Sequence, residues 1–347
     1  MKKINPIYYA ILAALSYGIS MPIAKLLLEN IPPIFMAGLL YFGAGLGMLL
    51  VNLFKNKKSR QSEAKITKKE LPYTIAMIAL DVFAPIFLMI GLTMSTASTA
   101  SLLNNFEIVA TALIALIFFK EAVGKRTWIA IVFITIASII LSVEDFQTLS
   151  FSLGSVFVLL ACVCWGIENN CTNKLSLKDP LQIVVIKGFG SGVTSLVIAF
   201  ALNQYNLNFK YISIALLLGF IAYGLSIYFY IYAQRNLGAT RTSAYYALAP
   251  FIGAGLSFLI FWELPTISYL IALSVMIIGV YFTAIEKHKH EHFHKYMEHE
   301  HRHNHNDGHH THSHGESIIG EHSHLHIHNE ITHKHSHMPD LHHAHAH

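Results

Sequence analysis

The sequence predicts an all-α polytopic membrane protein with ten transmembrane helices and a separate polar tail. Of its 347 residues, 54% are hydrophobic and 13% are charged, about half the ~25% charged residues typical of soluble domains. Ten apolar windows approach the ~20 residues that a helix needs to cross a bilayer. All 23 histidines lie between His288 and His347, so the composition changes abruptly where the last window ends.

The ten windows follow one another with mostly short connections. Prolines mark several starts, namely Pro33, Pro72 and Pro180, as expected where the missing N–H of proline costs nothing. The first window follows Met1-Lys2-Lys3 but is too long for a signal peptide, so we expect a retained helix. The windows are 6–28, 33–54, 72–94, 98–119, 127–143, 152–173, 182–202, 211–233, 239–261 and 266–285.

Basic residues predict the orientation in the membrane, because Lys and Arg concentrate in cytoplasmic loops. Alternate connections carry nearly all of these residues, and the connections between them carry few. The asymmetry places both termini in the cytoplasm and the protein in the cell (inner) membrane. The richest connection, 55–71, holds Lys55, Lys57, Lys58, Arg60, Lys65, Lys68 and Lys69.

Two segments resemble each other, one in each half of the chain. Residues 97–121 align without gaps with residues 239–263. Five helices in each half would make the halves point in opposite directions, as in the inverted repeats of secondary transporters. The positions shared by the two segments are Ala97/Ala239, Ser101/Ser243, Ala112/Ala254, Phe119/Phe261 and Glu121/Glu263.

These motifs resemble the EamA-type transporters of the drug/metabolite transporter superfamily. The resemblance rests on the five-plus-five layout, the small-residue starts and Phe-x-Glu ends of the two segments, and Tyr17-Gly18…Lys25 repeated as Trp165-Gly166…Lys174. It implies a secondary transporter with two inverted EamA repeats of five helices each, 1–145 and 150–286, often an exporter of metabolites or amino acids. The family often has a proline in the fourth helix, where this chain has Ile108; Pro250 stands at the matching position of the ninth.

Glu107 is the central candidate for substrate binding. A carboxylate inside a membrane helix is costly and is a functional-site hypothesis by default. Asn104 and Thr111 stand three and four residues away and share its predicted helix face. Glu107 could contact an amine of the substrate or carry a proton; the alternative is a structural hydrogen bond to a neighbouring helix.

Further polar residues lie within the apolar windows. Asp81 could contact substrate or form a buried ion pair with Lys25 or Lys187. Glu168 and Asn169 are expected to line a cavity, although Cys164, Glu168 and Cys171 share a helix face and could together bind a soft metal. Aromatic residues could line the same cavity or simply pack, and the candidates are Tyr17, Trp165, Tyr245 and Tyr246.

The tail, residues 287–347, is predicted to be disordered, because it has no apolar periodicity and cannot bury a core. Imidazole binds Zn, Ni, Co and Cu ions well, so the tail could hold such ions, whether or not this affinity is used. The candidate ligands are His288, His290, His292, His294, His299, His301, His303, His305, His322, His324, His326 and His328.

The sequence therefore predicts a secondary transporter that exports a small metabolite by alternating access, needs no cofactor and is compatible with proton coupling and with a homodimer. The alternative is a transporter of a divalent metal or a metal-chelating metabolite, with the tail as cytoplasmic metal collector or sensor. A membrane-anchored metal store without flux is a third hypothesis. The sequence argues against an enzyme, since it holds no Ser/His/Asp set, no phosphate-binding or dinucleotide motif, and no histidine before the tail to act as a base. We expect no nucleic-acid partner.

Overall fold

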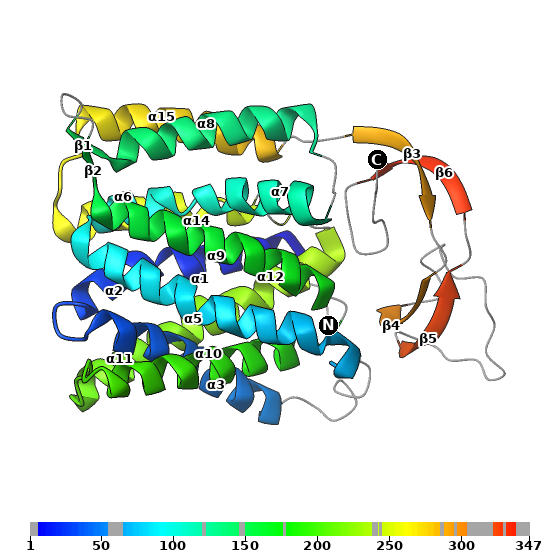
Figure 1. Cartoon of the computed structure of the whole chain (residues 1–347), viewed down its shortest axis with the longest axis horizontal. Helices are drawn as coiled ribbons and strands as arrows, with labels where there is room; N and C mark the ends of the chain where they lie inside the picture. Colours follow the sequence, from blue (N-terminus) through cyan, green and yellow to red (C-terminus); the bar gives the residue numbers. More distant parts are fainter. Residues whose placement is uncertain are drawn as a thin grey trace.

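The computed structural model describes most of the helical region and part of the tail. Helices and their connections are described at residues 6–54, 65–119, 123–145, 150–175, 178–237, 242 and 245–284. In the tail, four strand segments are described. The helices form one bundle, and the tail strands lie beyond one end of it (Figure 1).

The first half of the bundle follows the predicted windows closely. The 3-10 turn η1 begins with a capping box between Thr67 and Glu70, which satisfies free N–H groups at the start of the third window. The elements are α1 (Pro6–Gly18), α2 (Ser20–Leu27), α3 (Pro33–Phe54), η1 (Lys68–Glu70), α5 (Leu71–Met94), α6 (Ala97–Leu103), α7 (Phe106–Phe119) and α8 (Lys125–Ser142).

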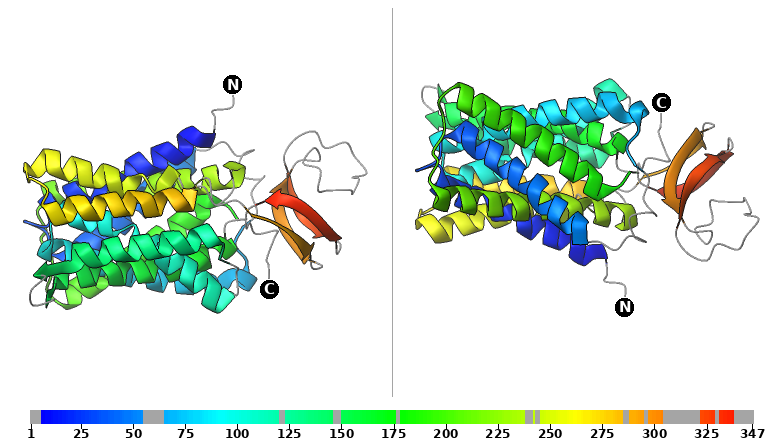
Figure 2. Two further views of the ribbon diagram at one scale, coloured as in Figure 1. Left: turned by 90° about the horizontal axis from the view of Figure 1, so that it is seen from above. Right: turned by 90° about the horizontal axis from the view of Figure 1, so that it is seen from below.

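The second half begins after a short hairpin of β1 (Val143–Asp145) and β2 (Ser150–Phe151). α15 ends at the same end of the bundle at which α1 begins (Figure 2). The elements are α9 (Leu153–Leu175), α10 (Pro180–Ala201), α11 (Phe209–Gly219), the π-helical segment η2 (Phe220–Leu225), α12 (Ser226–Leu237), α14 (Ala249–Phe261) and α15 (Ile267–Ala284).

Nine helical segments of the described chain are long and apolar enough to cross a membrane, which confirms the polytopic helical class. Helix α14, which lies in the predicted window 239–261, is shorter than a membrane span requires. Residues 239–241 and 243–244 of that window lie outside the described residues, so the count of ten stays a prediction.

Several predicted helices are interrupted within their windows. The first divides after Gly18 into α1 and α2, and the fourth divides at Asn104–Asn105 into α6 and α7. Asparagine competes with the helix by bonding to nearby backbone, and Asn105 Nδ2 donates to the Leu102 carbonyl at 3.3 Å. The fourth helix therefore breaks without the family's proline. Interrupted helices within a membrane are typical of transporter sites.

The main helix contacts join the two halves. α3 packs against α10, α5 against α9 and α8 against α15, while α1 contacts α12 and α14. Glycines allow two of these close approaches. A Cβ at Gly45 would meet the backbone of α10 at Phe189 N, 2.9 Å away, and one at Gly91 would meet the Gly154 carbonyl oxygen at 2.7 Å.

The tail differs from our expectation of disorder. β3 (His288–His294) pairs antiparallel with β6 (Ile331–His337), and β4 (Met297–His303) with β5 (His322–His328). Alternating sequences have the two-residue period of a strand, and this register sets histidine positions opposite one another, as at His290 and His335. Backbone pairing thus organises these four segments of the tail. The remaining tail residues lie outside the description, and so does His305.

Candidate functional site

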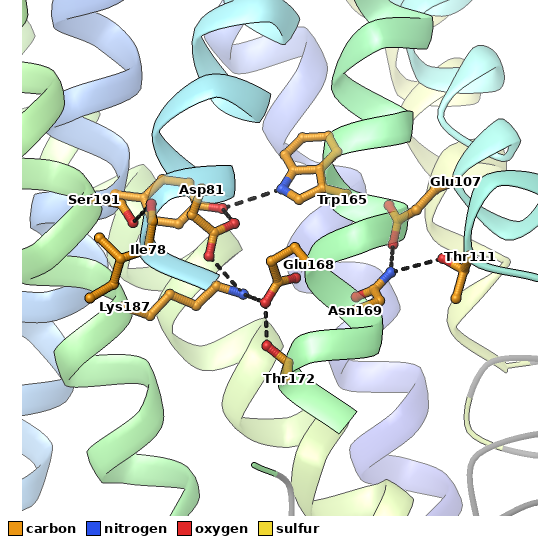
Figure 3. A network of polar contacts seen from close by, with 11 residues as sticks. Ile78, Asp81, Glu107, Thr111, Trp165, Glu168, Asn169, Thr172, Lys187 and Ser191 are labelled. Atoms are coloured by element: carbon orange, nitrogen blue, oxygen red, sulfur yellow. Dashed lines mark hydrogen bonds and ion pairs between the residues drawn. The ribbon is translucent and has the colours of Figure 1, made fainter. Parts of the chain in front are cut away.

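A buried ion cluster connects three helices in the middle of the bundle (Figure 3). Lys187 Nζ on α10 lies 3.1 Å from Asp81 Oδ2 on α5 and 2.8 Å from Glu168 Oε1 on α9. The three side chains are only 6%, 0% and 3% exposed, respectively. An isolated buried charge is very costly, so each member depends on the others for compensation. The ion cluster Asp81–Lys187–Glu168 therefore ties one helix of the first half to two of the second.

Neutral side chains also donate hydrogen bonds to the carboxylates of Asp81 and Glu168. The Tyr41 hydroxyl on α3 donates to Asp81 Oδ1 at 2.8 Å, and the Trp165 Nε1–H on α9 donates to that hydroxyl oxygen at 3.4 Å. On the other side, Thr172 donates to Glu168 one helical turn away. Donors of this kind orient the carboxylates and reduce the cost of their burial.

Glu107 lies in the first turn of α7, where the partial positive charge of a helix N-terminus favours an anion. The Asn169 amide on α9 donates to Glu107 Oε1 at 2.6 Å and to Thr111 Oγ1 at 3.3 Å. Figure 3 shows both acceptors turned toward α9. Glu107 thus faces the opposite half of the bundle, not lipid, and no Lys or Arg is paired with it among the described side chains.

Four tyrosines, Tyr17, Tyr41, Tyr223 and Tyr246, form a tyrosine cluster beside these carboxylates. The ring centroids are 5.3 Å apart for Tyr41 and Tyr223, 5.7 Å for Tyr17 and Tyr223, and 5.9 Å for Tyr17 and Tyr246. Asn104 at the end of α6 donates to the Tyr17 hydroxyl at 3.0 Å. The cluster thereby links the break between α6 and α7 to the π-helical segment η2, which carries Tyr223.

The structure brings most of the predicted site residues into this region. Glu107 and Thr111 share a face and a common partner in Asn169, as their spacing indicated. Asn104 instead ends α6, because the helix breaks before Glu107. The structure also decides the partner of Asp81: Lys187 pairs with it.

The structure selects between two neighbouring candidates and adds two tyrosines to the site. Of Tyr245 and Tyr246, Tyr246 makes the ring contact with Tyr17. Tyr41 and Tyr223 carried no sequence signal, since tyrosine is common in membrane helices. Lys187 did carry one, as a lysine deep in an apolar window.

Lys25 has a structural role at the end of α5. Its Nζ donates to the carbonyl oxygens of Leu92 at 2.6 Å and Ser95 at 2.8 Å. A cation at a helix C-terminus satisfies free carbonyls and complements the helix dipole. Lys25 therefore links α2 to α5, and of the two lysines considered for Asp81 it is Lys187 that pairs with it.

The cysteine-based metal hypothesis does not fit the geometry. Glu168, its central ligand, is occupied by Lys187 and Thr172. Among the described side chains, no three Cys, His, Asp or Glu residues are grouped as a metal site would need. The histidine side chains of the tail lie outside the described side chains, so metal binding there stays a prediction.

Both halves of the chain match one known protein family. A model of the EamA-like transporter family matches residues 4–143 and, a second time, residues 152–285. Both matched segments contribute to the polar site: Asp81 and Glu107 come from the first, and Glu168, Asn169 and Lys187 from the second. The match confirms the resemblance inferred from the motifs.

Two relatives have names that indicate a transporter. An uncharacterized transporter of Methanothermobacter thermautotrophicus is 27% identical over 286 residues, covering 78% of this chain and 83% of that protein. The uncharacterized transporter YyaM of Bacillus subtilis is 24% identical over 228 residues, covering 62% and 73%, respectively. A solved crystal structure with 13% identity has a TM-score of 0.59 and covers 81% of this chain and 96% of its own, which shows a shared fold.

Proposed function

Because the chain belongs to the EamA-like transporter family, we propose that it is a secondary transporter that exports a small metabolite by alternating access. The observation that carries the proposal is a buried polar site assembled from both family segments. Charged groups are too costly within a membrane protein to be kept without a purpose, and in transporters they mark the substrate or ion pathway. The site also adjoins interrupted helices, where transporter sites are commonly found.

The contacts across the two halves suggest how access could alternate. Asp81–Lys187, Glu107–Asn169 and Tyr41–Trp165 each join one half to the other. If the halves part toward one side of the membrane, some of these contacts must open and expose their carboxylates. A substrate or a proton would then replace the lost partner, which couples binding to the movement.

The proposal also includes the inverted relation of the two segments and their orientation in the membrane. We take the two segments to be inverted repeats in the cell membrane, with both termini and the tail in the cytoplasm. The basic connection 55–71 supports this orientation. α1 begins and α15 ends at one end of the bundle (Figure 2), as both termini on one side require. Cysteine labelling from either side of the membrane tests it.

Glu107→Gln tests the proposed site. A growth-toxicity screen of metabolites and metals, with and without the gene, first provides a cargo. Flux of that cargo is then measured in liposomes that contain the full chain. We expect Glu107→Gln to reduce flux at least tenfold and to flatten its dependence on pH, since Glu107 accepts from Asn169 and lies within electrostatic range of Glu168 and Lys187. Glu29→Gln, at an exposed carboxylate, should leave flux unchanged. Unchanged flux and pH dependence in Glu107→Gln would remove Glu107 from the mechanism.

Deleting residues 287–347 distinguishes metabolite export from the alternative, the transport of a divalent metal or a metal-chelating metabolite. The names of the relatives mention a transporter and no metal. We therefore expect the shortened chain to retain flux of its cargo, and any Zn, Ni, Co or Cu binding by the intact chain to fall. Loss of flux that depends on these ions would instead assign the tail to the transport of metals.

A further inference from the structure

The charges of the site do not balance. Asp81, Glu107 and Glu168 supply three carboxyl groups, and Lys187 is the one cation paired with any of them in the described chain. Lys187 already bridges Asp81 and Glu168, whereas the one close donor to Glu107 among the described residues is the neutral Asn169 amide. The site therefore has a place for positive charge, and that place is at Glu107.

A second, independent observation points to a missing ligand. Tyr223 on η2 is 2% exposed, and its hydroxyl has no hydrogen-bond partner among the described residues. A buried hydroxyl without a partner costs roughly 1–3 kcal/mol. The Tyr223 ring lies 5.3 Å from that of Tyr41 and 5.7 Å from that of Tyr17, and the group is close enough to Asp81 to interact with it electrostatically, so it lies beside the carboxylates of the site. π-helical segments such as η2 occur frequently at functional sites.

The aromatic groups suit a cation. Tyr17 and Tyr246 both lie near Glu107, and their ring centroids are 5.9 Å apart. Tyr223 packs edge-on against Tyr17, with an angle of 75° between the rings. Aromatic faces attract ammonium groups, and clusters of such rings recognise alkylated ammonium ligands. A carboxylate beside the rings adds a charged partner for an N–H donor.

We propose that the cargo is a small organic cation, whose ammonium group binds Glu107 and the tyrosine cluster and donates an N–H to the Tyr223 hydroxyl oxygen. The proposal rests on the transport function proposed above. An anionic cargo would face Glu107 and Glu168 without a free cation, because Lys187 could bind it only by leaving two buried carboxylates unpaired. A neutral cargo would leave Glu107 without a charged partner.

Three probes of one shape and different charge test the substrate class: phenethylamine, phenethyl alcohol and phenylacetate. Their binding to the full chain in lipid nanodiscs is measured by calorimetry. We expect phenethylamine to bind at least tenfold more tightly than the other two. Glu107→Gln should reduce this preference to less than threefold. Glu107→Asp keeps the charge and should keep part of the preference, which separates loss of the carboxylate from loss of the fold.

Tyr223→Phe separates a ligand contact from simple packing. If the hydroxyl serves only the fold, its removal leaves phenethylamine affinity unchanged; we expect a loss of threefold or more, with no loss of thermal stability in the empty protein. Tyr281→Phe, at an exposed tyrosine on α15, is the matched control and should have no effect.

Three results would overturn the inference: equal binding of the three probes, no binding of any probe, or an unchanged preference in Glu107→Gln. These results are distinct from failure of the proposed function. If an uncharged or anionic metabolite is carried across liposomes by the chain, transport stands and only the substrate class is wrong. If no compound from the toxicity screen crosses under any gradient, the transport function itself is wrong.

Discussion

Replacing Lys187 by methionine should strongly destabilise the protein. The change keeps a similar length of apolar side chain but removes the only ammonium near Asp81 and Glu168 in the described structure. Removal of one partner from a buried ion pair costs about 3–5 kcal/mol, because an uncompensated charge stays behind. Here two carboxylates lose their cation, and both are almost fully buried. We therefore expect a loss at or above the upper end of this range.

The measurement is reversible unfolding of the purified protein in mixed micelles by titration with a denaturing detergent. Lys210→Met is the control, since Lys210 is exposed and packs only over the Tyr211 ring, 5.8 Å from its centroid; it should cost less than about 1 kcal/mol. The triple change of Lys187→Met with Asp81→Asn and Glu168→Gln should recover much of the loss, since no charge then lacks a partner. The reasoning is refuted if Lys187→Met is as mild as Lys210→Met, or if the triple variant is no more stable than the single one.

Three further changes test other contacts. Gly188→Leu should force α3 and α10 apart and cost about 1–3 kcal/mol of stability, which would appear as a lower yield of monodisperse protein. The control Gly255→Leu should be tolerated, because a Cβ at Gly255 meets nothing within 4 Å. Equal yields of the two variants would contradict the close packing at Gly188. Lys25→Met removes the donor to the last carbonyls of α5 and should speed hydrogen exchange there, while unchanged exchange would show that the contact is dispensable. Tyr41→Phe removes the hydrogen-bond donor to Asp81 and the acceptor of the Trp165 indole N–H. We expect the stability to fall by about 1–3 kcal/mol and the tryptophan emission to shift. An unaltered emission spectrum would argue against the hydrogen bond of the indole.

The sequence predicts the positions of most helices well, because the cost of exposing backbone to lipid requires long apolar helices. α3, α9 and α10 lie within two residues of their predicted windows at either end. Interruptions are harder to predict, because they depend on competition between local bonds and packing. The break at Asn104–Asn105 arises without a proline, and nothing in the pattern distinguishes it from a continuous helix.

In the tail, the structure differs from what the sequence predicts. The tail has no apolar periodicity and cannot bury a core, which predicts disorder. The alternation of its histidines matches the period of a β-strand, and the structure pairs His299 with His326 and His301 with His324 in register. Composition alone does not reveal which segments pair, because pairing joins residues far apart in the chain.

The sequence by itself determined that this chain is a polytopic helical protein of the EamA type, with Glu107, Asp81 and Lys187 placed at membrane depth. The reason is solvation: the length of an apolar segment and the rare charged residues within it can both be read directly from the sequence. Only the tertiary structure decided that Lys187 bridges Asp81 and Glu168, that Asn169 connects Glu107 to the other half, and that the Tyr223 hydroxyl is left without a partner. These facts depend on which helix faces meet, and that choice is made by the packing of the whole bundle.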